Sequence, residues 1–447
     1  MANTTLSRLG IAAGDRTKWT FSAWVKRSGL GSDAQHIFSG NSERTGGSNY
    51  TSFYFDNDQL RYYDYYNSGI QNTFTTNAKY RDVNGFYHLV LAYDSTQSTA
   101  SNRVKLYVNG EQVTSFAATS YPGPSEGSFM NVSGNDNYIG NQTTSGGYPF
   151  SGSMSHIHFI DGTAYDASAF GETDATTGEW EAKTSPSVTY GTNGFFILKD
   201  GNGITDQSGE GNDFTLGGGT LTDLKDNPDN VFATMNPLDN YYQGSTFSNG
   251  NNTVVSGSSS TTFNTSTLMM TSGKYYVEVK PTAGSATSQI GVTGRLAVNA
   301  TSTLAVTTSA VGYLDSGSVW GSNSNQGGTW STYSNNDIIG IAVDCDNNKL
   351  YFSKNGVWQN SGVPTSGSTG TGAISLTAPS STTNGAYAFA MNETWNDNTR
   401  TWQWNFGNGY FGTTAVASAG TNASGIGIFE YDVPTGYTAL STKGLNL

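Results

Sequence analysis

The sequence predicts an all-β protein built of two antiparallel β-sandwiches. Only 12% of the 447 residues are charged, about half the usual share. Ser, Thr, Asn and the 56 Gly must therefore fill most solvent-facing positions. Helical surfaces are usually rich in Glu, Lys and Arg, which argues against helices. Short alternating apolar runs, punctuated by Gly, Asn, Asp and Pro, recur along the chain as in sandwich proteins.

In the first region the predicted strands are, in chain order, WTFSAWVKR, HIFSG, SFYFD, LRYYDYY, YHLVLAYD, RVKLYVNG, NYIG and SHIHFID. In RVKLYV, Val104, Leu106 and Val108 share one face, while Lys105 and Tyr107 share the other. This period of two predicts a half-buried strand. In the second region we expect strands at KYYVEVKPT, QIGVTG, AVGYLDS, DIIGIAVDCD, NKLYFSKNG, AYAFAMNE and TWQWNFG, with a last strand in the tail GIGIFEYDVPTGYTAL.

Two similar stretches indicate equivalent hairpins in the two regions. RVKLYVNG ends at Gly110 and NKLYFSKNG ends at Gly356, and each follows an apolar run that ends in Asp. We predict that Leu106 and Leu350 face the two cores. Each Asn-Gly predicts a turn, because both residues tolerate a positive φ. The likeness therefore indicates fold, and repeated chemistry is the weaker interpretation.

The residues between these regions are dominated by Pro, Asp, Asn and Gly, with a few anchoring aromatic residues. A flexible linker would contain fewer Trp and Phe, so we expect an ordered, loop-rich connector that packs against its neighbours. The predicted divisions are a first sandwich at residues 1–165, the connector at 166–238 and a second sandwich at 239–447.

Charge and cysteine usage exclude several partners. The net charge of −13 would repel polyanions, so nucleic acid is not expected as a partner. No run approaches the ~18 apolar residues of a membrane span, so we expect no membrane insertion. Cys345 is the single cysteine, which rules out an intrachain disulfide. The N-terminal stretch MANTTLSRLGIAAGDRTKW has no apolar core of signal-peptide length, so export by a cleaved signal is not expected.

Specific motifs resemble known families. WTFSAWVKR, GFYHLVLAYD, VKLYVNGEQV, YIG and FSGSMSHIHFIDG resemble the laminin-G-like, concanavalin-type jelly rolls over residues 15–165. SGKYYVEV, IGV, VGYLDSG, DIIGIAVDCDNNKLYFSKNGVW and WNFG resemble the SPRY domain. The connector motifs FIDGTAYDASAFGETDATTGEW, YGTNGFF, DQSGEGNDF and DNPDNVFATMNPL resemble the segment that joins such domains in tailed-phage structural proteins of the tail-fibre type.

The resemblance implies a virion protein: a tail-fibre or surface-fibre appendage that binds a host surface, glycan in the first place, without catalysis. Its implied partners are other virion proteins and a host cell-surface glycan or protein. A homo-oligomer is expected, with a trimer as the guess for a fibre. Two alternatives stay open. One is a purely structural decoration or collar protein that makes protein–protein contacts, and the less favoured one is a glycan depolymerase.

A glycan-cleaving site would need two carboxyl groups about 5–9.5 Å apart across the sugar. On one strand this requires a Glu-x-Asp-x-x-Glu run, and the nearest approach is Glu172, Asp174 and Glu179 in GETDATTGEWE. The spacing does not fit and the run lies in the connector, where Asp and Glu are usually solvated or cap turns. No G-x-S-x-G motif is present. We therefore predict no enzyme and no catalytic residue.

Metal sites are not indicated either. His156 and His158 in SHIHFID could share a strand face, but one pair is too few for the usual coordination sphere. DCDNN begins like a calcium loop, yet Lys349 replaces its Gly and Asn355 replaces its Glu, which favours a tight turn. A calcium site in the jelly roll is conceivable only if turn residues such as Asp94, Asp136 and Asp161 converge. We predict no cofactor.

Aromatic residues are the best ligand candidates, because a sugar can stack its C–H face on Tyr or Trp while Asp or Asn accepts hydroxyl protons. The stretch YYDYY holds Tyr62, Tyr63, Asp64, Tyr65 and Tyr66, and strand alternation should bury only one of its faces. In the second region the candidates are Trp320, Trp330, Trp395 and Asn396, which we expect in loops. Packing at sandwich edges or subunit contacts is the competing interpretation for each ring.

Overall fold

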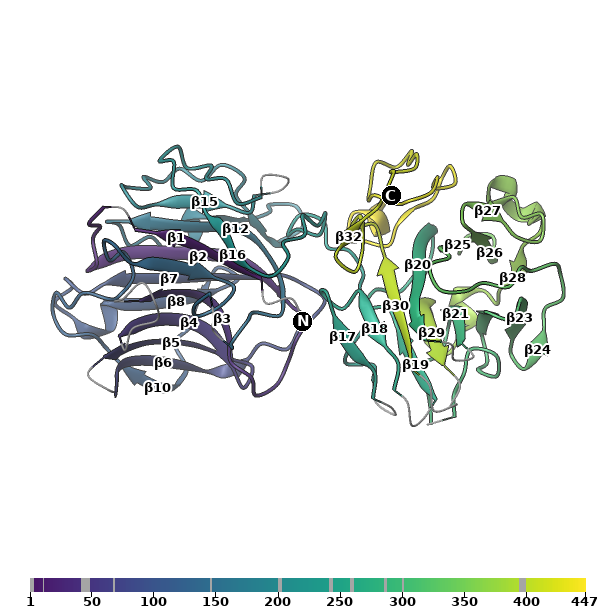
Figure 1. The fold of residues 1–447 in the computed structure, drawn as a ribbon, viewed down its shortest axis with the longest axis horizontal. Coiled ribbons are helices and arrows are strands. Elements are labelled where there is room, and N and C mark those ends of the chain that lie inside the picture. Colours follow the sequence, from purple (N-terminus) through teal and green to yellow (C-terminus); the bar gives the residue numbers. More distant parts are fainter. Residues whose placement is uncertain are drawn as a thin grey trace. The chain divides into compact units, whose positions relative to one another are not determined.

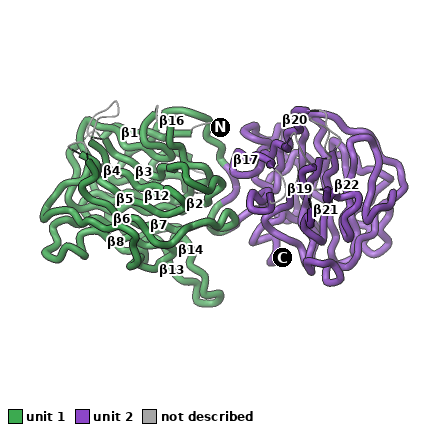
Figure 2. Tube along the Cα trace, turned by 90° about the horizontal axis from the view of Figure 1, so that it is seen from below, with its two compact units in different colours: residues 1–223, 227–229 green, residues 224–226, 230–447 purple. Residues whose placement is uncertain are grey.

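The computed structural model divides the chain into two compact units (Figures 1 and 2). It describes residues 4–10, 12–41, 49–66, 69–144, 147–199, 203–240, 244–257, 261–284, 288–299, 301–393 and 399–447. The first unit comprises residues 1–223 and 227–229, and the second comprises 224–226 and 230–447. Most of the predicted connector, 166–238, thus belongs to the first unit. Each unit holds two large, mainly antiparallel sheets, so the predicted all-β class is confirmed.

The first unit consists of an eight-stranded and a six-stranded sheet. In pairing order, the eight-stranded sheet contains β10 (Phe116–Ser120), β6 (Gly69–Lys79), β5 (Gln59–Tyr66), β4 (Tyr50–Asp56), β3 (Gln35–Asn41), β11 (Asp136–Ile139), β1 (Thr5–Leu9) and β16 (Thr215–Gly218). The six-stranded sheet contains β15 (Phe195–Ile197), β12 (Gly152–Asp161), β2 (Lys18–Arg27), β7 (Tyr87–Asp94), β8 (Val104–Val108) and β9 (Glu111–Gln112). The unit also has a separate hairpin, β13 (Gly171–Thr173) with β14 (Trp180–Ala182), and two short 3₁₀ helices, η1 (Ala100–Asn102) and η2 (Ala167–Ala169).

Aromatic side chains join the two sheets of the first unit into one core. Phe21 of β2 stacks on Phe38 of β3 with ring centroids 4.5 Å apart. Trp19 of β2 stacks on Tyr93 at 5.2 Å and meets Tyr62 of β5 at 6.5 Å. Rings of this size each remove a large apolar area from water, which makes them the main stabilising contacts of the sandwich.

The second unit repeats this plan. Its nine-stranded sheet runs β17 (Thr246–Ser248), β18 (Thr253–Val255), β30 (Arg400–Asn405), β20 (Lys274–Gly284), β25 (Ile339–Asp344), β26 (Lys349–Lys354) and β27 (Val357–Trp358), with β28 (Ile374–Ser375) on β26 and β33 (Thr438–Ala439) on β20. Its six-stranded sheet runs β19 (Thr262–Thr265), β29 (Ala388–Glu393), β21 (Ser288–Thr293), β22 (Ala310–Leu314), β23 (Ser318–Gly321) and β24 (Ser324–Asn325). A hairpin of β31 (Tyr410–Phe411) and β32 (Thr414–Ala415) and the 3₁₀ helices η3 (Pro364–Thr369), η4 (Pro379–Ser381) and η5 (Gly444–Asn446) complete it.

Within the tail GIGIFEYDVPTGYTAL, the predicted last strand is reduced to the two-residue β33, which pairs in parallel with β20. The rest of that stretch is irregular and packs as a cover. Phe429, Val433 and Tyr437 form a cluster with Tyr276 of β20 on the face of the nine-stranded sheet that points away from the main core.

The two KLY stretches are equivalent strands, as predicted. β8 and β26 each pair antiparallel with the strand that ends in Asp, and Leu106 and Leu350 are buried in the respective cores. Asn109 and Asn355 both have a φ of 49° and are followed by glycines of positive φ. The side-chain Oδ1 of Asn109 accepts the backbone N–H of His88, as Asn355 Oδ1 does from Ile338, each at 2.8 Å.

Candidate functional site

The candidate site lies on the outer face of the eight-stranded sheet, along β3, β4 and β5. The hairpin of β4 and β5 turns at Asn57 and Asp58, whose φ angles of 51° and 64° fall in the left-handed region that Asn and Asp tolerate. This tight turn fixes the register, so that Tyr50 pairs with Tyr65 across the two strands. Alternate residues of both strands then point away from the core.

Six rings form a continuous row on this face, which we call the aromatic row: Tyr65, Tyr50, Tyr63, Tyr54, His36 and Tyr148. Centroids of consecutive rings are 5.2, 5.5, 5.3, 4.7 and 5.7 Å apart in that order. The middle of the row is closely packed, with Tyr54 only 5% and Tyr63 9% exposed, whereas Tyr148 at one end is 49% exposed. Tyr50 and Tyr65 at the other end are partly exposed. The accessible rings are therefore those at the two ends.

Three polar atoms beside the aromatic row lack a partner. Within the part of the chain that the structure describes, His36 Nδ1, Asn41 Nδ2 and Ser52 Oγ are enclosed and make no hydrogen bond. Native proteins leave few such atoms, because each costs about 1–3 kcal/mol unless a partner is supplied. Burial lowers the pKa of His36 to about 3, so its imidazole is neutral at physiological pH.

Charges next to the aromatic row are paired with each other. The guanidinium of Arg61 forms an ion pair with Asp56 at the end of β4, and it lies over the ring of Tyr54, 5.5 Å from the centroid. The row thus presents rings, amides and hydroxyl groups with little net charge. Such a surface can recognise a ligand by stacking and neutral hydrogen bonds, the combination typical of sites for uncharged polar molecules.

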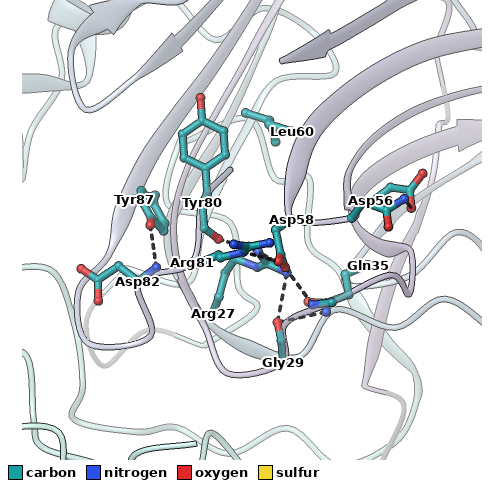
Figure 3. Close-up of polar contacts among 12 residues, drawn as sticks. Arg27, Gly29, Gln35, Asp56, Asp58, Leu60, Tyr80, Arg81, Asp82 and Tyr87 are labelled. Carbon is teal, nitrogen blue, oxygen red and sulfur yellow. Dashed lines mark hydrogen bonds and ion pairs between the residues drawn. The ribbon is translucent and has the colours of Figure 1, made fainter. Parts of the chain in front are cut away.

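A buried ionic cluster holds the turn of the β4–β5 hairpin in place (Figure 3). Arg27, at the end of β2, is fully buried and places Nη1 3.1 Å from Asp58 Oδ1. The same nitrogen donates to the carbonyl of Tyr80 at 2.5 Å, while Arg81 Nε lies 2.8 Å from Asp58 Oδ2. Figure 3 shows the two arginines meeting at Asp58. Because Arg27 belongs to the other sheet, the cluster connects both layers beneath one end of the candidate site.

Opposing effects set the pKa of Asp58. Burial alone would raise the pKa of this carboxyl, but the backbone N–H of Gly31, together with Arg81 and Arg27, outweighs burial and holds the pKa below its usual value. Asp58 is therefore ionised at neutral pH. The hydrogen bonds and ion pairs that converge on Asp58 tie the hairpin turn to β2 and to the segment after β6, which should restrict its motion.

The structure divides the YYDYY stretch between the two faces of β5. Tyr62 is fully buried in the core, and Asp64 is 2% exposed on the same face, so neither can contact a ligand on the outer surface. Tyr63 and Tyr65 point outward and belong to the aromatic row. Tyr66 is partly exposed at the strand end, where its ring meets Phe129 at 6.0 Å.

The buried Asp64 and the partly exposed Glu126 share one amide, a connection that has no signature in the sequence. Asn72 Nδ2 donates to both Asp64 Oδ2, at 3.1 Å, and Glu126 Oε1, at 2.8 Å. Burial raises the pKa of Asp64 to about 6, although hydrogen bonds from Thr51, Tyr62 and Asn72 oppose the shift. The amide of Asn72 thus bridges the two carboxyl groups.

In the second unit, one of the described tryptophan candidates lies in a strand and the other packs on neighbouring rings. Trp320 lies in strand β23 and not in a loop, which corrects the prediction for that residue. Trp330 does lie in a loop, but its ring packs on Tyr313 and Phe352 at 5.7 and 6.0 Å, and its indole N–H donates to the carbonyl of Gly327 at 2.6 Å. Trp395 and Asn396 fall outside the described residues.

The residues considered for catalysis and metal binding are engaged in local structure. Asp174 accepts the backbone N–H groups of Thr176 and Thr177, so it caps the turn of the β13–β14 hairpin. DCDNN forms the predicted tight turn, in which Asp344 Oδ1 accepts the N–H of Asn347 at 2.9 Å. Among the residues described, no group of three or more His, Cys, Asp or Glu side chains is arranged to hold a metal ion.

One serine–histidine pair has no signature in the sequence. Ser22 Oγ lies 2.9 Å from His88 Nε2, and His88 Nδ1 accepts the indole N–H of Trp180 at 2.9 Å. Because Nδ1 is the acceptor, Nε2 carries the proton and cannot take one from Ser22. This tautomer is the wrong one for a general base, and both residues are fully buried.

The comparisons with known proteins agree with this architecture. The family model described as the concanavalin A-like lectin/glucanases superfamily matches residues 4–169, which is less than half of the chain. The matched residues include every strand of the eight-stranded sheet except β16, and hence the aromatic row. The first unit therefore contains a concanavalin-like sandwich. No curated protein matches the chain.

Three solved structures are similar to parts of the chain, each at 18% identity. The match to the SPRY domain of human HERC1 has a TM-score of 0.29 and covers 38% of this chain and 96% of that one. The match to the heptameric SAP-like pentraxin of Limulus polyphemus has a TM-score of 0.27 and covers 37% of this chain and 72% of that one. The match to the Ruminococcus gnavus IT-sialidase CBM40 bound to α2,3-sialyllactose has a TM-score of 0.24 and covers 32% of this chain and 75% of that one. At these values the likenesses carry no functional argument. None of the helices in the described ranges is long and apolar enough to cross a membrane.

Proposed function

We propose that this protein is a carbohydrate-binding appendage of a phage virion, which attaches to host-surface glycan through the aromatic row and performs no catalysis. The aromatic row is the observation that carries the proposal. Sugars present C–H faces that stack on tyrosine rings and hydroxyl groups that require hydrogen-bond partners. Tyr50, Tyr65 and Tyr148 supply accessible rings at the two ends of the row.

The absence of catalysis is supported by the positions of the acidic residues. On the outer face of β3, β4 and β11, as far as these strands are described, the carboxyl groups are those of Asp56 and Asp136. The register of β3 places Asp56 near one end of that strand and Asp136 near the other. At ~3.3 Å per residue they are about 20 Å apart, well beyond the 5–9.5 Å that glycoside hydrolysis requires.

The virion assignment rests on the connector motifs and on the uncharged polar composition. A site built of stacking and neutral hydrogen bonds has modest affinity, and several copies on one particle would raise it through effective concentration. We propose a homo-oligomer, a trimer if it belongs to a fibre, whose other partners are neighbouring virion proteins.

A glycan array probed with the purified protein tests carbohydrate binding. We expect binding to a subset of host-surface glycans, its loss in the double variant Tyr50→Ala/Tyr65→Ala, and its retention in Trp320→Ala, which changes an aromatic residue in the other unit. Absence of binding to every glycan, in a folded protein, would reject this function and leave the structural decoration protein as the better account. Release of reducing ends from a bound polysaccharide would contradict the non-enzymatic part.

The location of the protein in an intact particle tests the virion part separately. Gold-labelled antibody against this chain should decorate an external appendage. Absence of the chain from purified particles would refute the virion assignment, even if the purified protein binds glycans.

A further inference from the structure

In the first unit, residues 164–190 form a cover, here called the strap, over the outer face of the six-stranded sheet. Val90, Ile160 and Tyr107 of the sheet form an apolar cluster with Phe170 of the strap, and Trp180, on β14, packs against the same cluster. Figure 2 shows the β13–β14 hairpin of the strap projecting from the first unit. The sheet contributes two histidines to this buried contact, His88 and His158, which are 0% and 1% exposed.

His88 is held in its neutral form by the strap. The indole nitrogen of Trp180 is a donor only, and it donates to His88 Nδ1 at 2.9 Å. A protonated imidazole carries hydrogen on both nitrogens, so two donors would then face each other at this distance. The ring of His88 also lies between Trp24, 4.8 Å away, and Trp180, 5.9 Å away. A new charge at His88 would therefore be desolvated and would also lack an acceptor on the strap side.

His158 adds to the same effect. Its ring stacks on Phe196 with centroids 4.0 Å apart and lies 5.2 Å from Phe170, while Nδ1 is 2.9 Å from the hydroxyl of Tyr190. Burial lowers the pKa of His88 to about 3 and that of His158 well below its usual value. Both histidines would regain ordinary pKa values of about 6.5 once in water.

The charged and titratable neighbours do not offset protonation of these histidines. His156 of β12 and Lys199 lower the pKa of His158, and His156 also lowers that of His88. The remaining titratable groups on the outer side of β2, β7 and β8 are Lys18, Lys26, Asp94, Lys105 and Tyr107. Those of the strap are Tyr165, Asp166, Glu172, Asp174, Glu179, Glu181, Lys183 and Tyr190. The strap carboxylates are on its exposed side, so they do not pair with the buried imidazoles.

We propose that the strap is an acid-released cover: protonation of His88, supported by His158, detaches Trp180 and the β13–β14 hairpin from the six-stranded sheet and exposes its aromatic outer face. The direction of the pH effect follows from the linkage between protonation and closure. The closed state binds fewer protons than the open state between pH 6.5 and 3, so closure weakens as the pH falls through that window. Each participating histidine reduces the closed-to-open ratio about tenfold per pH unit below 6.5.

The second unit contains an equivalent cover whose attachment should not weaken as the pH falls. This cover is therefore an internal control. Trp180 lies against Gly110 of the first Asn-Gly turn, and Tyr431 of the C-terminal tail lies against Gly356 of the second. That tail is fastened by Glu278, whose carboxylate accepts the backbone N–H groups of Glu430 and Tyr431, each at 2.8 Å. Burial raises the pKa of Glu278 to about 7, so acid does not drive this cover away.

Hydrogen–deuterium exchange of the full chain at pH 7 and pH 4.5, corrected for the pH dependence of chemical exchange, tests the proposal. Protection of residues 171–182 should fall about a hundredfold between pH 6.5 and 4.5 if His88 alone titrates, and further if His158 takes part. Protection of residues 417–437 and of the inner strands β2 and β7 should persist. Unchanged protection of the hairpin, or a loss shared equally by β2 and β7, would overturn the proposal.

His88→Gln supplies the decisive variant, because its amide oxygen can still accept from Trp180 but cannot titrate. We expect its hairpin protection to lose most of the pH dependence. His36→Gln is the matched control, since His36 is also buried and neutral but lies on the other sheet, and it should retain the wild-type profile. Where His88→Gln does not fold, Trp180→Phe keeps the ring and removes the donor. Hairpin protection in Trp180→Phe should fall several-fold at pH 7, and an unaltered value would reject the role of this bond.

Discussion

Among single residues, the buried pair of Arg27 and Asp58 has the largest expected effect on stability. Asp58→Ala would leave a fully buried guanidinium without its carboxylate, which costs about 3–5 kcal/mol. Asp56→Ala, in the same hairpin, removes an ion pair of which both side chains are partly solvated, and should cost about 0–1 kcal/mol. Urea unfolding of the two variants measures both values. Similar free energies for the two would contradict the structural role of the buried cluster.

Glu278 should make the stability of the second unit depend on pH. Its folded-state pKa of about 7 lies above the ordinary value, so the folded state binds the additional proton. The second unit should therefore lose stability as the pH rises from about 4.5 through 7. Glu278→Gln should be less stable throughout, because one backbone N–H then faces an amide NH₂, but its stability should vary less with pH. Thermal unfolding between pH 5 and 8 measures this, and equal pH slopes for both proteins would refute the prediction.

The YYDYY stretch shows how far residue-level prediction from sequence extends. Alternation places Tyr62 and Asp64 on one face of the strand and Tyr63 and Tyr65 on the other, but Tyr63 on the outer face is also only 9% exposed. Which face is buried could not be decided, because tyrosines occupy both faces, and the buried Asp64 is stabilised by Thr51 and Asn72 from neighbouring strands. Four members of the aromatic row were not identified as site residues, namely Tyr50, Tyr54, His36 and Tyr148. They come from β4, from β3 and from a loop, which only the fold brings beside β5.

At the scale of elements, the Asn-Gly turn of β8 and β9 depends on the strap. Gly110 has a φ of +84°, and a Cβ at this position would lie 2.8 Å from the ring of Trp180. Gly134 has a φ of +80° with nothing within 4 Å. Gly134→Ala should therefore cost only the left-handed backbone penalty of about 1–2 kcal/mol, and Gly110→Ala should cost more. The midpoints of thermal unfolding rank the variants, and the reverse order would count against packing of Trp180 on the turn.

Strands with a strong alternating pattern could be predicted from the sequence, whereas the segments that cover the sheets could not. The strands of HLVLAYD, RVKLYVNG and their counterparts in the second unit follow from alternation and Asn-Gly turns. The strap has almost no periodic pattern, and its position depends on a few aromatic anchors such as Phe170 and Trp180. The sequence therefore predicted an ordered segment that packs on its neighbours, but not the sheet face that it covers.

On the scale of the whole molecule, the two units have separate hydrophobic cores and should unfold separately. Cys345 reports on the second unit alone, since it is 5% exposed and burial raises the pKa of its thiol to about 12. Its reaction with a thiol reagent at pH 8 should require unfolding of that unit. Asp58→Ala should thus lower the unfolding midpoint of the first unit without shifting the urea midpoint of Cys345 labelling. A shift of both midpoints would indicate one cooperative unit.

The aromatic row should bind glycan, and calorimetric titration of the array-selected glycan tests this binding most directly. Truncation of one contacting ring typically costs about 1–2 kcal/mol of binding free energy, so Tyr65→Ala should raise the dissociation constant about tenfold. The double variant Tyr50→Ala/Tyr65→Ala should raise it further. Trp320→Ala should leave it unchanged. An unchanged dissociation constant in the folded double variant would contradict the claim that this face is the binding site.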